Sequence, residues 1–124
     1  MDKGPVFRKS FDFAADIIKA VRQLRQAGCE RELLSQLLRS GTSIGANINE
    51  AQSAQSRKDF IAKMSIALKE ARETEYWLRL LNVTESVSVE MAAGLLKKVD
   101  ELIRLLVSIV KTMRETTNIN NSKL

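Results

Sequence analysis

The stretch RSGTSIGANINEA, at positions 39–51, contains the residue types of a phosphate-binding loop. Gly41 and Gly45 stand four positions apart beside Ser and Thr, and glycines let backbone amides approach a phosphate closely. A Walker loop requires GxxxxGK[ST], however, and here Ala-Asn-Ile follows the second glycine. A dinucleotide-binding turn requires a preceding strand, whereas leucines at helical spacing precede this stretch. The pattern therefore favours a helix whose buried side contains two glycines.

Residue sets for catalysis or metal binding are incomplete in this chain. It contains no His, which removes the commonest general base and the commonest zinc ligand. Glu70, Glu73 and Glu75 suggest a di-metal carboxylate bundle, but such sites also use Glu-x-x-His motifs. The single cysteine, Cys29, lies at a helix start, where a thiol pKa can fall, yet no His is available to act with it. We therefore expect no enzyme and no cofactor.

The two glycines require a compensating contact. Each costs roughly 1 kcal/mol in helix propensity relative to Ala, and close approach of a neighbouring helix would offset this cost. In a hairpin closed by the short 53–56 connection, Gly41 and Gly45 lie near the height of Ala67 and Ala71. We expect the second and third helices to be closest there, and Gly45→Leu to destabilise the fold by well over ~1 kcal/mol.

A polar line flanks the glycine stripe, formed by Ser43, Asn47 and Glu50 at i, i+4 and i+7. Two interpretations stay open. The line is an exposed polar face, or it is a partly buried network with Arg72 or Glu75 that fixes register or an intersubunit contact. Periodicity alone does not decide burial at the edge of a stripe.

Four segments with helical apolar spacing must position these residues. The predicted helices span about 7–27, 30–53, 57–82 and 88–116, followed by a frayed polar tail over 117–124. A single proline and five glycines among 124 residues also favour an all-α chain. Short connections predict one domain, residues 1–124, folded as an antiparallel up-down-up-down four-helix bundle.

Capping residues agree with these boundaries. Gly28 follows the first helix, as expected of a residue that ends one. Ser56 is placed to accept a hydrogen bond from the Asp59 amide, and Ser86 or Ser88 to cap the fourth helix.

Charge and composition limit the partners. Twenty Lys and Arg against 15 Asp and Glu give a net charge of +5, which permits nucleic-acid binding without establishing it. The lone cysteine excludes an intramolecular disulfide and fits a reducing compartment. We find no signal-peptide pattern and no apolar run long enough for a bilayer, so we expect a cytoplasmic protein with no membrane contact.

The central block carries a family resemblance. Residues 36–81, QLLRSGTSIGANINEAQSAQSRKDFIAKMSIALKEARETEYWLRLL, closely resemble the 23S rRNA intervening-sequence (S23) proteins. The family's S-I-x-x-N-I-x-E core is matched by Ser43, Ile44, Asn47, Ile48 and Glu50. The following Asp59-Phe60 pair, the runs 64–68 and 73–78, and both ends of the chain also resemble family segments.

This resemblance implies a four-helix bundle that assembles into a ring-shaped homopentamer. No enzymatic activity belongs to the family's usual description, and nucleic-acid binding is inferred from charge and genomic context. A similar protein is the accessory subunit of diversity-generating retroelements, where it binds a reverse transcriptase and nucleic acid.

Our first hypothesis is therefore a homo-oligomer that binds RNA, or DNA, without strict sequence readout. An oligomer multiplies the net charge and adds multivalency, while the lack of an aromatic ladder argues against base readout. The candidate phosphate contacts are Arg8, Lys19 and Arg22 on the first helix, Arg57, Lys58 and Lys63 on the third, and Lys97, Lys98 and Arg104 on the fourth.

The alternative is a scaffold subunit that recruits a protein partner such as a reverse transcriptase. Ile66, Trp77 and Leu80 form a second apolar stripe beside the core face of the third helix. Aromatic anchors are enriched in subunit interfaces, so these three are the candidate oligomer contacts.

Overall fold

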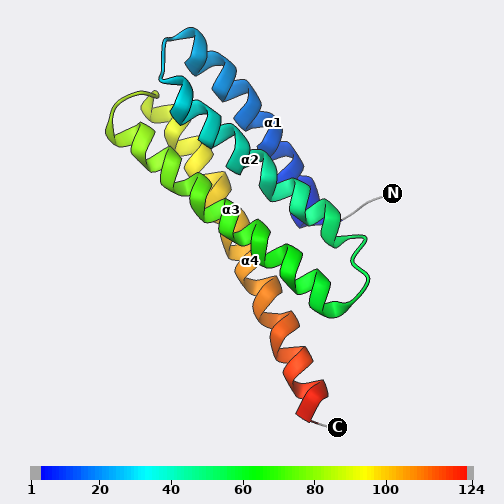
Figure 1. Cartoon of the computed structure of the whole chain (residues 1–124). Coiled ribbons are helices and arrows are strands. Elements are labelled where there is room, and N and C mark those ends of the chain that lie inside the picture. Colours follow the sequence, from blue (N-terminus) through cyan, green and yellow to red (C-terminus); the bar gives the residue numbers. More distant parts are fainter. Residues whose placement is uncertain (1–3, 123–124) are drawn as a thin grey trace.

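The protein is a bundle of four helices, and the predicted all-α class is confirmed. The computed structural model describes the backbone of residues 4–122 and the side chains of residues 4–117. The helices are α1 (Pro5–Gln26), α2 (Arg31–Ala51), α3 (Arg57–Val83) and α4 (Val89–Ser122). Successive helices reverse direction, and the end of α4 extends past the other three (Figure 1). Each helix packs against its neighbours in the order α1, α2, α3, α4, and α4 closes the bundle against α1.

Local signals set the helix boundaries. Pro5 occupies the first turn of α1, where its missing N–H costs no hydrogen bond. Gly28 follows α1 with φ 88°, and the Cys29 amide returns to the Leu24 carbonyl at 3.0 Å. This left-handed residue with its backward hydrogen bond ends α1 and turns the chain toward α2.

Serine caps begin α3 and α4. The Ser56 hydroxyl accepts from the Asp59 amide at 3.0 Å, so the predicted cap of α3 is confirmed. The Ser88 hydroxyl accepts from the Met91 amide at 3.1 Å. Ser88 is therefore the cap of α4, while Ser86 bonds to the Thr84 hydroxyl instead.

The helical C-terminus corrects one expectation. We expected fraying from residue 117, but α4 continues to Ser122. No Gly or Pro interrupts this segment. The Thr116 and Thr117 hydroxyls donate to carbonyls one turn earlier, each at 2.8 Å, so polar side chains are accommodated within the helix. Residues 123–124 lie outside the described part of the chain.

The two glycines of α2 face α1, so the expected contact with Ala67 and Ala71 is wrong. A Cβ at Gly41 would lie 2.9 Å from two side-chain carbons of Ile17. A Cβ at Gly45 would lie 3.2 Å from the Ser10 hydroxyl oxygen. Both glycines thus allow close approach of a neighbouring helix, as predicted. This helix is α1 and not α3.

A buried pair of hydroxyl groups occupies the other side of α2. Ser40 and Thr74 are fully buried, and a 2.9 Å hydrogen bond joins their hydroxyls across the α2/α3 contact. The Thr74 hydroxyl also lies 2.8 Å from the Glu70 carbonyl oxygen. This pair satisfies two buried polar groups and fixes the register of the two helices. The sequence patterns did not single it out.

Within residues 4–122, no helix combines the length and the apolar character needed to cross a bilayer.

Candidate nucleic-acid interface

Three of the predicted phosphate contacts are already ion-paired. Lys63 lies 3.3 Å from Glu50, and Arg104 lies 2.9 Å from Asp100 one turn earlier on α4. Lys98 lies 2.5 Å from Asp16 across the seam between α1 and α4. A phosphate would have to displace a carboxylate at each of these positions, so they are weaker candidates than an unpaired cation.

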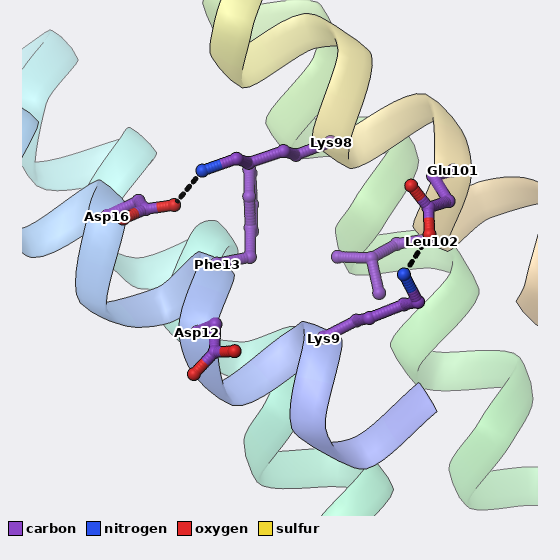
Figure 2. Close-up of a pocket in the computed structure, with 7 residues that line it drawn as sticks. All are labelled: Lys9, Asp12, Phe13, Asp16, Lys98, Glu101 and Leu102. Atoms are coloured by element: carbon purple, nitrogen blue, oxygen red, sulfur yellow. Dashed lines mark hydrogen bonds and ion pairs between the residues drawn. The ribbon is translucent and has the colours of Figure 1, made fainter. Parts of the chain in front are cut away.

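The seam between α1 and α4 shows why Lys98 is engaged. A hollow of about 230 Å³ lies there, with Phe13 and Leu102 among its lining residues. Two ion pairs cross it, Lys98 with Asp16 and Lys9 with Glu101 (Figure 2). The pKa of Glu101 is lowered by the hydrogen bond from Lys9 and by its charge. The hollow is lined by three carboxylates and two ammonium groups, since Asp12 also lines it, and this balance disfavours an anion.

The other six predicted cations are exposed but dispersed. Arg8, Lys19 and Arg22 lie on the outer side of α1. Arg57 and Lys58 begin α3, at the opposite end of the bundle from Arg22. Lys97 lies on the exposed side of α4. The fold therefore does not gather the predicted residues into one patch.

A different set of cations converges in a groove between α3 and α4. Arg72 of α3 and Lys111 and Arg114 of α4 line a hollow of about 340 Å³. None of the three forms an ion pair with a described residue, and Arg114 donates to the Ser65 hydroxyl at 3.3 Å. The remaining lining residues are Leu68, Val107, Val110 and Glu115. We call this hollow the α3/α4 groove.

An exposed aromatic ring follows Arg72 on α3 but does not line the groove. Tyr76 is one helical turn beyond Arg72 on α3, and 58% of its surface is exposed. Its ring contacts Trp77 edge-on, with centroids 5.0 Å apart. The α3/α4 groove itself therefore offers cations for phosphates but no aromatic ring among its lining residues on which a base could stack.

Sequence reasoning missed Lys111 and Arg114 and gave Arg72 another role. Lys111 and Arg114 are three positions apart on α4, a spacing that places them on one side of a helix. That spacing was the available signal. Their convergence with Arg72 depends on the register of α3 against α4, which no local pattern contains.

The polar line of α2 lies next to the other side of α3, away from the α3/α4 groove. The Ser43 hydroxyl donates to the Arg39 carbonyl at 2.6 Å, and the Asn47 amide donates to the Ser43 carbonyl at 2.8 Å. Ser43 and Asn47 are half-buried, whereas Glu50 is exposed and pairs with Lys63. Ser43 and Asn47 thus agree with a partly buried line, whereas Glu50 agrees with an exposed polar face.

The proposed network with Arg72 or Glu75 is wrong. Arg72 lines the α3/α4 groove, and Glu75 lies 3.7 Å from Arg79 on its own helix. Arg72 therefore lies on the α4 side of α3, and the ion pair of Glu75 stays within α3. The contact that α3 does make with Arg39 of α2 comes from Glu73, at 3.5 Å.

Two buried polar atoms on this flank lack partners among the described residues. Glu70 Oε2 and Trp77 Nε1 are inaccessible to solvent and form no hydrogen bond with a described residue. Burial, and then the charge of Glu73, raise the pKa of Glu70. Trp77 and Leu80 are half-buried, and Ile66 is 42% exposed. The surface of Ile66, Glu70, Glu73, Trp77 and Leu80 is called the α2/α3 face below.

Residues 3–108 match the sequence model of the 23S rRNA-intervening sequence protein family. The chain belongs to this family. It is also similar to a solved structure, a protein of unknown function from the S23 ribosomal protein family of Bacteroides thetaiotaomicron VPI-5482. The two are 50% identical with a TM-score of 0.84, over 86% of this chain and 99% of that one. Among curated proteins, no significant match was found.

The residues matched by the family model include only part of the α3/α4 groove. The motif residues Ser43, Asn47 and Glu50 lie well inside the matched region, whereas Lys111 and Arg114 follow its last residue, 108. Four of the seven lining residues therefore come from the segment that follows the matched region: Val110, Lys111, Arg114 and Glu115. This segment is helical and packs against α3 through Arg114.

Cys29 corrects another expectation. Burial and then the charge of Glu30 raise its pKa, although its position before α2 suggested the opposite. A neutral thiol is a poor nucleophile. Among the described residues there is also no group of three or more metal-ligating side chains.

Proposed function

We propose that this chain is a non-enzymatic, homo-oligomeric protein that binds the backbone of RNA in the α3/α4 groove without strict sequence readout. The observation that carries the proposal is the convergence of Arg72, Lys111 and Arg114, three cations with no carboxylate partner among the described residues. RNA is favoured over DNA because the family is defined by an element of 23S rRNA.

Electrostatics supports a polyanionic ligand. Each chain carries a net charge of +5, and an oligomer places several copies of the groove on one particle. The family resemblance suggests five copies. Weak phosphate contacts then add through multivalency, and binding releases condensed counterions, so affinity falls steeply with salt.

Fluorescence anisotropy with labelled 23S rRNA fragments tests the proposal across a salt series. We expect the triple variant Arg72→Gln, Lys111→Gln, Arg114→Gln to bind at least about tenfold more weakly than the native protein. The slope of log affinity against log salt concentration should become shallower by about 2, because up to three phosphate contacts are lost.

A matched control removes the same charge elsewhere. Lys19→Gln, Arg22→Gln, Lys97→Gln also neutralises three exposed cations, but none of them lines the groove. We expect this triple variant to bind within about threefold of the native protein, since only the general field changes. Equal weakening by both variants would remove the groove from the proposal, and no binding of the native protein at low salt would refute it.

A protein-recruiting scaffold is the second candidate, and the α2/α3 face favours it. Ile66 is exposed and lies on the same side of α3 as Trp77 and Leu80, and buried atoms of Glu70 and Trp77 lack partners among the described residues. A reverse transcriptase is the partner suggested by the family resemblance. Co-purification of the native protein and Trp77→Ala with that enzyme tests this candidate, and equal recovery would exclude Trp77 from the contact.

A further inference from the structure

Tyr76 is an exposed aromatic residue that is not part of the bundle core. It belongs neither to the buried residues nor to the half-buried residues that pack against them. Its exposed fraction is 58%, whereas that of Ile66 on the same helix is 42%. A single exposed apolar side chain is common on protein surfaces. The role of Tyr76 therefore depends on which groups surround it and on how its ring is held.

Tyr76 lies on the same side of α3 as two residues that face α4. Ser65, Lys69, Arg72 and Tyr76 are separated by four, three and four positions, a spacing that places them on one side of a helix. Ser65 accepts a hydrogen bond from Arg114 of α4, and Arg72 lines the α3/α4 groove. The stripe of α3 that borders the groove therefore continues to Tyr76, one helical turn past Arg72.

The register of α3 against α4 gives the distance of Tyr76 from the groove. The two helices are antiparallel (Figure 1), and the contact between Arg114 and Ser65 fixes their relative positions. Counting along both helices from this contact places Arg72 level with Val107, and both residues do line the groove. The same count places Tyr76 one turn, roughly 6 Å, past this level. An extended ligand that leaves the groove along this side of α3 therefore passes Tyr76.

The ring of Tyr76 is held in one orientation by its neighbour. It contacts the ring of Trp77 edge-on, with centroids 5.0 Å apart and an angle of 74° between the ring planes. Trp77 is itself half-buried and packs against the core, so it is a firm support. A ring that is already oriented loses little conformational freedom when a ligand binds to it.

The neighbours of Tyr76 along this side of α3 are cations. Lys69 and Arg72 precede it by seven and four positions, and Arg79 follows it by three. Lys69 and Arg72 form no ion pair with a described residue, whereas Arg79 lies 3.7 Å from Glu75. An aromatic anchor of a protein interface is surrounded by apolar contacts. A ring among cations instead fits a nucleic-acid strand, whose phosphates pair with the cations while a base stacks on the ring.

We propose that Tyr76 stacks on an unpaired base of an RNA strand whose phosphates bind in the α3/α4 groove, so that the site selects single-stranded over double-stranded RNA. This inference rests on the proposed function and specifies the class of RNA. In a duplex the bases stack on each other, and a protein contacts mainly the backbone, so the ring adds nothing. One ring accepts any base, which agrees with binding without strict sequence readout. The groove's acid, Glu115, adjoins Arg114 at the end away from Tyr76.

Fluorescence anisotropy with two labelled probes tests this selection: an unpaired RNA oligonucleotide and an RNA hairpin with the same number of phosphates. The native protein should bind the unpaired probe more tightly. We expect Tyr76→Ala to weaken binding of the unpaired probe by about tenfold, the size of effect that stacking of one base produces. Binding of the hairpin should change by less than about twofold, because no phosphate contact is removed. For the same reason, the salt dependence of binding to either probe should stay as in the native protein.

Two further variants at this position separate stacking from apolar contact. Tyr76→Phe keeps the ring and should restore the affinity for the unpaired probe. Tyr76→Leu keeps an apolar side chain against Trp77 without a ring, and should bind that probe as weakly as Tyr76→Ala does. Native affinity in Tyr76→Leu would overturn base stacking. Phe11→Ala is the matched control, since Phe11 is 63% exposed and contacts Phe7 but lies on α1. It should bind both probes as the native protein does.

The outcomes distinguish this inference from the proposed function. Equal binding of the unpaired probe by the native protein and Tyr76→Ala, with weaker binding by the triple variant of the groove cations, overturns the stacking role alone. Equal affinity of the native protein for the two probes also overturns the selection and leaves the groove in place. A native protein that binds neither probe at low salt overturns the proposed function together with this inference.

Discussion

The two flanks of α3 present opposite surfaces. Toward α2, the flank contains a buried hydroxyl pair, a desolvated carboxyl group and a buried indole nitrogen. Toward α4, it borders an open groove with apolar residues and three cations without carboxylate partners among the described residues. The flank toward α2 has features of a protein-binding surface. The flank toward α4 has features of a surface that binds a polyanion.

This difference teaches that one helix supplies only half of each surface. Arg72 becomes part of a basic groove because α4 adds Lys111 and Arg114. Glu73 becomes part of a charge-balanced face because α2 adds Arg39. A residue's role therefore depends on which neighbouring helix lies on its side.

The largest loss of stability is expected at the contact between α1 and α2, because the α2/α3 face exists only if α2 keeps its position on α1. Gly41→Leu should reduce the free energy of unfolding by about 3 kcal/mol, since even a Cβ there lies 2.9 Å from Ile17. Urea denaturation measures this change. In contrast, Gly94→Ala on α4 meets open space and should stabilise the protein by up to about 1 kcal/mol. A Gly41→Leu protein with native stability would contradict the close packing of α1 on α2.

A smaller effect compares one hydroxyl on each flank. Thr74→Val removes the buried hydrogen bond to Ser40 and should cost about 1 kcal/mol of unfolding free energy. Ser65→Ala removes an exposed contact with Arg114 on the other flank and should change stability by less than about 0.5 kcal/mol. Thermal unfolding of both variants measures the difference, and equal losses would show that the two flanks are not distinct in stability.

The smallest effect concerns pH. The raised pKa of Glu70 means that its contribution to stability is fully present below its ordinary value of 4.5 and is lost as pH rises through the raised value. Above the raised pKa the ionised, desolvated carboxylate is unfavourable, so Glu70→Gln should raise the melting temperature there. This gain should shrink as the pH falls toward 4.5. A gain that is constant with pH would exclude ionisation of Glu70 as its cause.

Glu101 provides a control of opposite sign. Its pKa is lowered by Lys9, so its contribution is present above its ordinary value and is lost as pH falls through the lowered value. Glu101→Gln should therefore slightly lower the melting temperature at pH 7 and have no effect in acid. The same sign for both variants would argue that burial does not distinguish the two carboxyl groups.

Local signals in the sequence were sufficient for the helices. Apolar periodicity located all four, Ser56 was identified as a cap, and Gly28 was placed at the end of the first helix. These features depend on residues within one or two turns of each other. Fraying after residue 116 was the exception, because threonine hydroxyls bond within the helix and sustain it.

The candidate site was predicted less well. The nine cations were chosen by residue type and by their positions on the predicted helices, yet Lys63, Lys98 and Arg104 are ion-paired and the other six are dispersed. Lys98 illustrates the cause: its partner Asp16 is 82 positions away, so the pairing depends on where α1 meets α4.

The sequence by itself determined that the chain forms four amphipathic helices, where they begin, and most of the apolar stripe that each buries, with the exposed Phe11 as an exception. Periodicity fixes these properties because each helix buries its apolar side whatever covers it. Only the tertiary structure decided that Gly41 meets Ile17 and that Arg72 joins Lys111 and Arg114. Those relations depend on the order and register of helices around the bundle, which are set by contacts between segments far apart in the chain.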